Sequence, residues 1–543
     1  MSNSIYRVPP AVNEPIFSFA PGTKERASLQ KTLVQMSSET VDIPIIIGGE
    51  EIRTGNTANC VMPHNHKHIL GSYHKAGQKE VQMAIDSSLN ARKVWSEMPW
   101  EARVAVFKKM AALLQGPYRD VINAATMLGQ SKNAFQAEID SACELIDFFN
   151  FNCEYIQQIY SEQPPHSPDG MWNQVEYRGL EGFVFAVTPF NFTSIAANLP
   201  TAPALMGNSV VWKPASSSVY SGYFLMRLFK EAGLPDGVIN FVPGSGAQVG
   251  DPVLESEHLA GIHFTGSTAV FQGMWRKVGE NIHNYKTYPR IVGETGGKDF
   301  ILAHKSSDVK GLATAMVRGA YEYQGQKCSA ASRCYIPESL WAGVKAEFLS
   351  QVSTIKMGDV NDFSNFVNAI IDEAAFDSIS GYIDYAKNSS DAEIICGGNF
   401  DKSIGYFIEP TAILTTNPHF ESMEEEIFGP VLTIYVYNES WEHICDIVDT
   451  TSEYALTGAI FSKCRKAINI ARKLLVHSAG NFYVNDKPTG AVVGQQPFGG
   501  SRASGTNDKA GSAANLMRWV SQRTIKETFV PPTDYRYPFL ETE

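Results

Sequence analysis

The sequence predicts an α/β protein built on a doubly wound, mostly parallel sheet. From about residue 183, short apolar runs alternate with amphipathic stretches, as they do where strands are covered by helices on both faces. A further α/β region with its own strands spans about 320–510. At 543 residues the chain exceeds the size at which one hydrophobic core stops growing, so two or three domains are expected.

The N-terminal part of the chain predicts an arm followed by helices. Residues 1–70 are irregular and rich in Pro, Asn and Gly, with one strand-like run at Ile45–Ile47, so an extended arm is expected. Asp169-Gly170 marks a turn, and 172–178 is typical of a strand in a hairpin. Apolar residues at helical spacing predict helices from about Lys79, over 99–114, and from about Ala134 into the 150s.

The central region predicts the parallel sheet, and the C-terminal end predicts one more strand. The alternation at 524–530 fits an edge or swapped strand. Buried strands are expected at 183–187, 209–212, 238–242 and 261–264, with a helix over 219–232.

Composition and charge exclude several classes of function. The net charge of −12 argues against nucleic acid as the main partner, since phosphate contacts need concentrated Lys and Arg. No stretch approaches the ~18 apolar residues of a membrane span. The eight cysteines are scattered without a C-x-x-C pair, which fits a reducing compartment. Residues 1–12 lack a secretory apolar core and are too poor in arginine to indicate a transit peptide.

Cys328 and Glu294 form the most informative pair. Both lie in glycine-bearing segments, Gly325-Gln326-Lys327-Cys328 and Glu294-Thr295-Gly296-Gly297. A cysteine thiolate attacks carbonyl carbons and a carboxylate directs water, so the pair predicts covalent chemistry through a thioester. A glutamate in place of a histidine disfavours a papain-like protease. The alternative is a buried structural cysteine, for which Cys334 is a good candidate.

Polar residues after predicted strands indicate a ligand site, because parallel strands meet their ligands at the carboxyl edge. Asn191 carries an amide suited to an oxyanion, although a helix-capping Asn is the alternative. Lys213 suits a ribose or phosphate, although a solvated lysine is the commoner case. Gly266 opens a turn before a helix, whose N-terminus attracts phosphate. The run Gly244-Ser245-Gly246 competes for that role, and spacing alone leaves the two unresolved.

Two charged clusters are the last candidates for functional sites in the sequence. Glu426 ends the acidic run 424–426 and precedes Ile427-Phe428 and a Gly-Pro turn, which favours a ribose-hydroxyl contact over a plain solvated face. The histidines at 64, 66 and 68 alternate but have no Cys or acidic ligands nearby. A surface loop is therefore expected there, not a metal site.

In their order along the chain, these segments resemble the aldehyde dehydrogenase superfamily, over about residues 13–530. The motifs are Pro189-Phe190-Asn191-Phe192, Trp212-Lys213-Pro214, Phe264-Thr265-Gly266-Ser267, Glu294-Thr295-Gly296-Gly297-Lys298, Gly325-Gln326-Lys327-Cys328 and Glu426-Ile427-Phe428-Gly429-Pro430. The resemblance implies the family fold, with NAD as the cofactor and no metal. Its parts would be an N-terminal arm (1–70), a Rossmann-like NAD-binding domain (71–317), an α/β catalytic domain (318–515), and a small β oligomerisation flap formed by a hairpin (about 160–180) and the C-terminal strand and tail (516–543).

The resemblance also implies a role for each residue of the catalytic and cofactor sites. Cys328 would be the nucleophile, Asn191 and the Cys328 N–H would hold the oxyanion, and Glu294 would direct the hydrolytic water. Ser216 stands where many members have a Glu that contacts the adenosine ribose, so NAD preference with some NADP use is expected. The residues expected at the cofactor are Thr188, Lys213, Gly266, Ser267, Thr268, Ala269, Val270, Glu426 and Phe428.

Further motifs resemble the branch of the family that oxidises L-glutamate 5-semialdehyde to glutamate in proline breakdown. They lie at 136–140, 178–183, 494–500 and 504–508. Ser329, Gly490 and Ala491 would bind the substrate carboxylate, Glu138 would lie near the ammonium, and Phe192 and Phe498 would enclose the aliphatic stem. Ala491 replaces a Ser found in some relatives, so only its amide would remain as a donor.

The resemblance implies a homo-oligomer, a dimer at least, in the mitochondrial matrix or, as the alternative, the cytoplasm. Two rival functions stay open at this point. One is oxidation of another short acidic semialdehyde. The other is a catalytically silent binding or structural protein on the same fold, against which the presence of Cys328, Glu294 and Asn191 argues.

Overall fold

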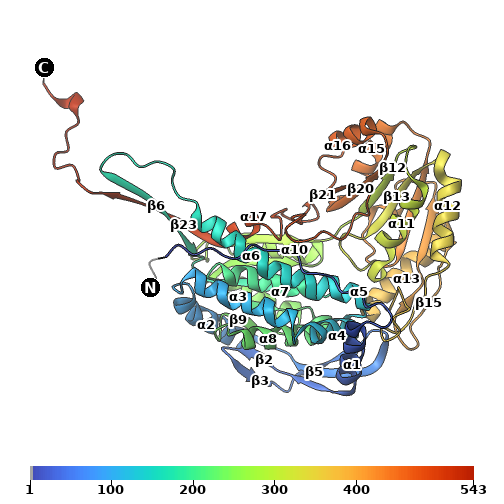
Figure 1. Cartoon of the computed structure of the whole chain (residues 1–543), viewed down its shortest axis with the longest axis horizontal. Helices are drawn as coiled ribbons and strands as arrows, with labels where there is room; N and C mark the ends of the chain where they lie inside the picture. The colour runs from blue at the N-terminus through green and yellow to red at the C-terminus, as the bar shows by residue number, and fades with distance from the viewer. Residues whose placement is uncertain (1–3, 543) are drawn as a thin grey trace.

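Two seven-stranded sheets organise the chain into two lobes (Figure 1). The computed structural model describes residues 4–542. The N-terminal sheet has the strand order β11-β10-β7-β8-β9-β2-β3, and the C-terminal sheet has the order β14-β17-β18-β13-β12-β20-β21. In Figure 1 the blue-to-green lobe carries the first sheet, and the yellow-to-red lobe carries the second.

The N-terminal sheet confirms the predicted doubly wound pattern. Its strands β7 and β10 are almost wholly buried, as parallel strands covered on both faces must be. Its parallel strands are β7 (Phe183–Val187), β8 (Ser209–Lys213), β9 (Ile239–Phe241), β10 (Leu259–Thr265) and β11 (Arg290–Glu294), and β2 (Ile45–Ile47) and β3 (Glu50–Ile52) extend it antiparallel. Its helices are α2 (Gln78–Trp95), α7 (Thr193–Leu205), α8 (Val219–Ala232), α9 (Gly246–Glu255) and α10 (Thr268–Glu280).

A helical layer, formed by residues 100–161, packs in the same lobe. The predicted helix over 99–114 is α3 (Trp100–Gln115), and α4 (Arg119–Gln130) follows it. The predicted third helix is α5 (Ala134–Ala137) and α6 (Glu144–Ser161), joined by a π-helical turn, η1 (Glu138–Cys143). This turn matters below, because it carries several side chains of the candidate site.

The C-terminal lobe begins earlier than predicted. β12 (Asp299–Ala303) pairs with β13 and β20, so the change of lobe lies between β11 and β12 instead of at residue 317. The other strands are β13 (Ala331–Pro337), β14 (Ala392–Cys396), β17 (Thr411–Thr415), β18 (Val431–Tyr437), β20 (Thr457–Phe461) and β21 (Asn481–Val484). The main helices are α11 (Val309–Tyr321), α12 (Glu338–Val352), α13 (Glu373–Lys387), α15 (Trp441–Thr450) and α16 (Arg465–Leu474).

The prediction of an arm over residues 1–70 is wrong for most of that range. Of the described residues in this range, 4–23 precede the first element and lie outside helices and strands, because α1 (Lys24–Ser38) begins with Thr23 as its N-cap. β1 (Val41–Ile43), β4 (Thr57–Met62) and β5 (Asn65–His74) form a three-stranded sheet. Every strand of this sheet is short or half-exposed, so the apolar pattern that would reveal it is weak.

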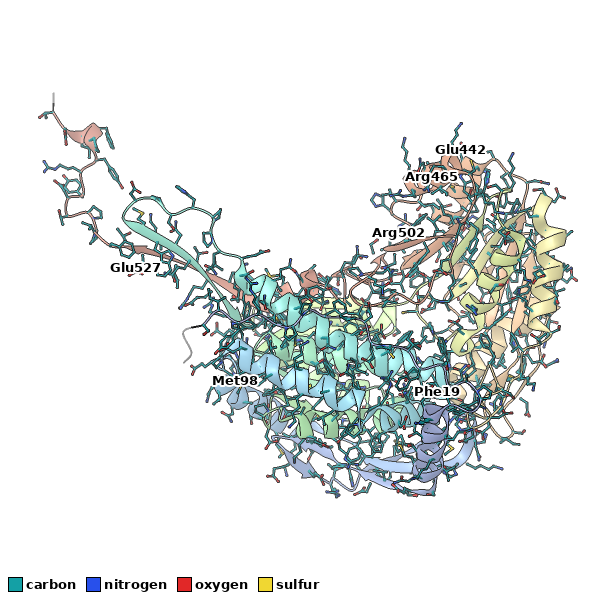
Figure 2. The ribbon with its side chains drawn as sticks, in the orientation of Figure 1. Phe19, Met98, Glu442, Arg465, Arg502 and Glu527 are labelled. Carbon is teal, nitrogen blue, oxygen red and sulfur yellow. The ribbon has the colours of Figure 1, made fainter. Side chains whose placement is uncertain are left out.

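The strand predicted at 172–178 exists, but it is not part of a local hairpin. β6 (Met171–Gly179) pairs antiparallel with β23 (Val520–Thr528), in a register that joins Gly179 to Val520. The two strands form a ribbon that projects from the N-terminal lobe toward the C-terminus in Figure 1, and Glu527 is labelled on it in Figure 2. The predicted C-terminal strand is therefore present, and it begins four residues earlier than expected.

Candidate active site

Cys328 follows a backbone turn in the left-handed region. After α11, Tyr323, Gln324 and Gly325 have φ values of 50°, 55° and 66°. The left-handed conformation costs an L-residue roughly 1–2 kcal/mol, so the turn needs support from its surroundings. The Tyr323 hydroxyl donates to the carbonyl of Gln130 at 2.8 Å. This hydrogen bond supports the turn and thereby the position of the nucleophile that follows it.

Two glycines let the backbone approach Cys328 closely. A Cβ on Gly297 would lie 2.1 Å from the carbonyl oxygen of Cys328, and one on Gly325 would lie 2.1 Å from that of Gly429. Both are backbone clashes that no side-chain movement relieves. Gly297 therefore packs the segment after Glu294 directly against Cys328, and Gly325 packs the segment before Cys328 against the turn at Gly429.

Two cavities meet at Cys328. The first, of about 660 Å³, extends toward η1, α6 and the loop 487–498. The second, of about 790 Å³, extends over the carboxyl edge of the N-terminal sheet. Ile195, Phe264, Thr265 and Cys328 line both cavities. The thiol thus lies at the point where molecules bound in the two cavities would touch.

Burial sets the protonation of the two central groups. It raises the pKa of the Cys328 thiol well above its ordinary value, and the nearby carboxyl of Glu294 raises it further. Burial likewise raises the pKa of Glu294 to about 8, although the Lys509 ammonium lowers it. Both groups hold their protons at neutral pH. A carboxyl with a pKa near 8 is well placed to take a proton from water in mildly alkaline solution.

Asn191 lies beside the nucleophile segment. Its buried side-chain Nδ2 donates to the carbonyl of Gln326 at 3.0 Å, which leaves one N–H of the amide group for another acceptor. The alternative of helix capping is not supported, because Phe192 is the N-cap of α7 and no side chain caps that helix. The amide is therefore available as a donor next to Cys328.

The second cavity has the donors and acceptors that a dinucleotide needs. The Lys213 ammonium donates to the carbonyl of Pro214 at 3.2 Å, which leaves two of its donors free, and burial lowers its pKa. The Glu426 carboxylate accepts from the Gly297 N–H at 2.9 Å, and burial raises its pKa to about 7. A lysine and a carboxylate at this edge suit ribose hydroxyls and phosphates, so the residues fit a dinucleotide.

Most of the residues predicted at the cofactor line this second cavity. The two competing glycine segments both take part, because Gly246 and Gly250 of α9 face the same cavity as the turn before α10. Thr268 and Ala269 do not line it, and the Thr268 hydroxyl donates to the carbonyl of Ala503 at 3.4 Å. The predicted residues that line it are Thr188, Lys213, Gly266, Ser267, Val270, Glu426 and Phe428.

Five of the six residues predicted at the substrate line the first cavity. The hydroxyls of Ser329 and Thr489 share a hydrogen bond of 2.7 Å, which joins the nucleophile segment to the loop that carries Gly490. The five residues are Phe192, Ser329, Gly490, Ala491 and Phe498.

The prediction that Glu138 lies near the substrate does not agree with the structure. Glu138 is fully buried outside the cavity lining, and its carboxylate accepts from Arg119 and from the Asn123 amide at 2.7 Å. The Phe17 N–H, at 2.9 Å, and the Cys143 thiol, at 3.5 Å, also donate to it. These partners use both oxygens, so the side chain is structural.

Glu144 is the acid that the sequence interpretation missed. It lines the first cavity, accepts a hydrogen bond from the Ser194 hydroxyl, and has a pKa raised to about 8 by burial and then by the charge of Asp140. The π-helical turn between the two acids sets their directions, and it leaves Glu138 outside the cavity and Glu144 in the cavity lining. No sequence signal distinguished the two acids, because the π-helical turn shows no pattern of its own in the sequence.

Three cations also line the first cavity, which sequence reasoning did not predict. They are Arg318, Lys327 and Lys487. Burial opposes the charge on Lys327, but Asp140, at 3.2 Å, and Glu322 raise its pKa above the ordinary value. Lys327 therefore stays charged one residue before the nucleophile. The cavity thus combines cations with acids, as a site for a zwitterionic substrate requires.

Neither a metal site nor a membrane span is found in the described part of the chain. Within residues 4–542 no three His, Cys, Asp or Glu side chains are grouped to hold a metal ion. The ring of His64 instead shares a 3.2 Å hydrogen bond with the Ser131 hydroxyl. Over the same residues, no helix is both long enough and apolar enough to cross a bilayer.

Two α/β lobes that bring a thiol between a dinucleotide cavity and a second cavity have the architecture of a cysteine-dependent dehydrogenase. The model of the aldehyde dehydrogenase family matches residues 52–525, and the chain belongs to this family. A relative from Dictyostelium discoideum, named Delta-1-pyrroline-5-carboxylate dehydrogenase, mitochondrial, is 53% identical over 536 residues, which cover 98% of this chain and 96% of the relative.

Other relatives carry the same name. The relative from Homo sapiens is 46% identical over 531 residues, covering 97% of this chain and 94% of its own. The solved structure of Delta-pyrroline-5-carboxylate dehydrogenase from Mycobacterium tuberculosis bound with NAD is 49% identical, with a TM-score of 0.96 and coverage of 100% of both chains. A Thermus enzyme named 1-pyrroline-5-carboxylate dehydrogenase, with bound NAD, is 31% identical, with a TM-score of 0.91 over 96% of this chain and 100% of that chain.

Proposed function

We propose that this chain oxidises L-glutamate 5-semialdehyde, which is in equilibrium with 1-pyrroline-5-carboxylate, to L-glutamate with NAD, as the second step of proline catabolism. The observation that carries the proposal is the first cavity. Its lining offers a thiol for the aldehyde, cations and backbone N–H groups for a carboxylate, and the acid Glu144 for an ammonium. The names of relatives at 53% and 46% identity support the same substrate.

The reaction begins at Cys328. The Cys328 thiol releases its proton to solvent water as its sulfur bonds to the aldehyde carbon, and the C=O double bond becomes the single bond of a hemithioacetal oxyanion. Asn191 and the Cys328 N–H donate to the oxyanion, which they stabilise most when its charge is fullest. Lys213 and Glu426 in the second cavity would hold NAD, which would supply the acceptor for the hydride that leaves this carbon. Cys328 is then left as a thioester of the substrate.

Glu294 completes the reaction by directing water. As the carboxylate it accepts a proton from a water molecule that attacks the thioester carbon. The carbon–sulfur bond then breaks, and Glu294 returns the proton to the departing Cys328 sulfur, which leaves as the thiol. The raised pKa of Glu294 makes it a stronger base than an exposed glutamate. Because both steps use the same oxyanion position, Asn191 serves each of them.

Substrate recognition depends on the charges of the first cavity. The backbone N–H groups of Gly490 and Ala491, with the Ser329 hydroxyl, bind the α-carboxylate, and Lys487 adds positive charge beside them. Glu144, in place of the expected Glu138, binds the α-ammonium, whose charge would favour the ionised form of this carboxyl. Phe192 and Phe498 enclose the stem.

The β6–β23 ribbon and the names of relatives support proposals for the assembly and the compartment. The ribbon of β6 and β23 projects from the lobe, and we propose that it joins two copies in a homodimer. The names of relatives from Dictyostelium discoideum and Homo sapiens include the word mitochondrial. They support a mitochondrial location, and we propose the matrix as the compartment.

A steady-state assay with two semialdehydes tests the proposed function. The purified protein should show a much higher kcat/KM with glutamate semialdehyde and NAD than with succinate semialdehyde, which lacks the ammonium that Glu144 would bind. A preference for succinate semialdehyde would replace the proposed substrate with another acidic semialdehyde. Lack of activity on both, with intact cofactor binding, would favour a silent binding protein.

A further inference from the structure

The segment of residues 8–17, here called the arm, runs extended along η1 and α6 in the opposite direction to the helix (Figure 1). Its backbone N–H groups bond to side chains of that helix instead of to other backbone groups. In order along the arm, the pairs are Val8 with Gln157, Ala11 with Glu154, Glu14 with Asp147 and Phe17 with Glu138.

The lengths of the two elements match. Nine steps of extended chain from Val8 to Phe17 span roughly 30 Å. The helical turns from Glu138 to Gln157 rise about 29 Å. The arm therefore keeps a fixed register along the helix from end to end. Two residues beyond the arm, Phe19 is buried. Figure 2 labels this residue on the side of the N-terminal lobe next to the C-terminal lobe.

Asn13 connects the arm to a second element. Its Nδ2 donates to Asp147 of α6 and to the carbonyl of Val493, both at 2.8 Å. Its Oδ1 accepts from the Gln495 side chain at 2.9 Å. One asparagine side chain thus ties α6 to the loop 490–495, using both hydrogens of its amide nitrogen.

The same residues form part of the wall of the first cavity. Asn13, Glu14 and Ile16 line it from the arm, together with Gly490 and Ala491 from the loop. The loop has a glycine in the left-handed region near each end, with φ of 94° at Gly490 and 82° at Gly494. A loop of this kind needs outside contacts to hold one conformation, and Asn13 supplies two of them, at Val493 and Gln495.

We propose that Asn13 is a positioning residue, through which the N-terminal arm fixes the loop 490–495 in the conformation that recognises the substrate carboxylate. Asn13 acts on the loop and does not touch the reacting atoms. The inference rests on the proposed function, because it assumes a substrate that carries a carboxylate. It assigns a role in specificity to a segment that precedes the part of the chain matched by the family model, residues 52–525.

The test compares two aldehydes on the full chain. Asn13→Ala should lower kcat/KM for glutamate semialdehyde about tenfold, mainly by raising KM, since two or three lost hydrogen bonds of a partly exposed side chain correspond to roughly that factor. For propanal, which has no carboxylate, kcat/KM should change less than twofold. A change in the ratio of the two substrates separates positioning from a general loss of folded enzyme.

Two further variants sharpen the test. Asn388→Ala is the matched control, because Asn388 is exposed and its amide donates only to Asp384 of its own helix, and it should leave both substrates unchanged. Gln495→Ala removes one contact from the loop side at an exposed position and should shift the ratio in the same direction, about threefold. It keeps the test decisive if Asn13→Ala does not fold.

One result would overturn the inference alone, and a different result would overturn the proposed function. An active wild type whose Asn13→Ala and Gln495→Ala variants keep the wild-type ratio of kcat/KM for the two aldehydes would overturn the inference alone. A wild type that oxidises propanal but not glutamate semialdehyde would overturn the proposed function, and the inference with it.

Discussion

The Asn191 side-chain amide donates to the backbone carbonyl of Gln326 at 3.0 Å, two residues before the cysteine that it serves. This bond uses one N–H and orients the other. Asn191→Ala should therefore lower kcat by about 10²–10³-fold, the usual cost of losing one oxyanion donor. NAD binding, followed by the quenching of protein fluorescence, should stay within a factor of two. A loss of kcat below tenfold would show that Asn191 is not an oxyanion donor.

Glu294→Gln should separate the two halves of the reaction. The substitution keeps the shape of the side chain but removes the base, so the thioester should form and then persist. Rapid mixing of this variant with substrate and NAD should give a burst of NADH close to one equivalent of active sites, followed by very slow turnover. If the burst is missing, Glu294 is needed before or during hydride transfer, and its assignment to water is wrong.

The pH dependence of turnover should follow the raised pKa of Glu294. Burial raises this pKa from an ordinary value of 4.5 to about 8, so the carboxyl is neutral below that pH and ionised above it. Only the ionised form accepts a proton from water. Where hydrolysis of the thioester limits kcat, kcat should therefore rise about tenfold per pH unit below 8 and level off above it. A profile that is flat between pH 6 and 8 under that limitation would contradict this role.

Glu138→Ala should act on stability and not on substrate binding. It removes the fully buried partner of Arg119, whose buried guanidinium keeps its ion pair with Glu14. The cost should therefore stay below the roughly 3–5 kcal/mol that an unpaired buried charge loses. Urea unfolding should show the loss in the free energy of unfolding. Glu144→Gln is the matched comparison, since it should raise KM for glutamate semialdehyde with a smaller effect on stability. The reverse assignment of effects would restore Glu138 as the substrate residue.

Much of the fold could be predicted because it depends on local pattern. The strand 183–187 and the helix 219–232 agree with β7 and α8 at both ends, since each is a continuous apolar or amphipathic run. The partner of β6 could not be predicted in the same way. Arg178 and Ser521 face each other across the ribbon although they are 343 positions apart, and no local signal selects that pairing.

The candidate site was also predictable only where local motifs carry its residues. Cys328, Glu294 and Asn191 lie in ordered motifs, and the structure brings their segments together at the meeting point of two cavities. Glu144 was missed because the π-helical turn 138–143 and the direction of each side chain decide which acid faces the cavity. Asn13 was also missed, because its contacts join residues 13, 147 and 493, which only the folded chain brings together.

The most direct test of the account is to trap the acyl group on Cys328. Glu294→Gln enzyme mixed with glutamate semialdehyde and NAD, quenched in acid and digested, should yield the Cys328 peptide with one added glutamyl acyl group by mass spectrometry. The Cys328→Ala variant should give no adduct and no turnover while it still binds NAD. An unmodified Cys328 peptide in enzyme that produces NADH, or an acyl group on another cysteine such as Cys334, would contradict the account.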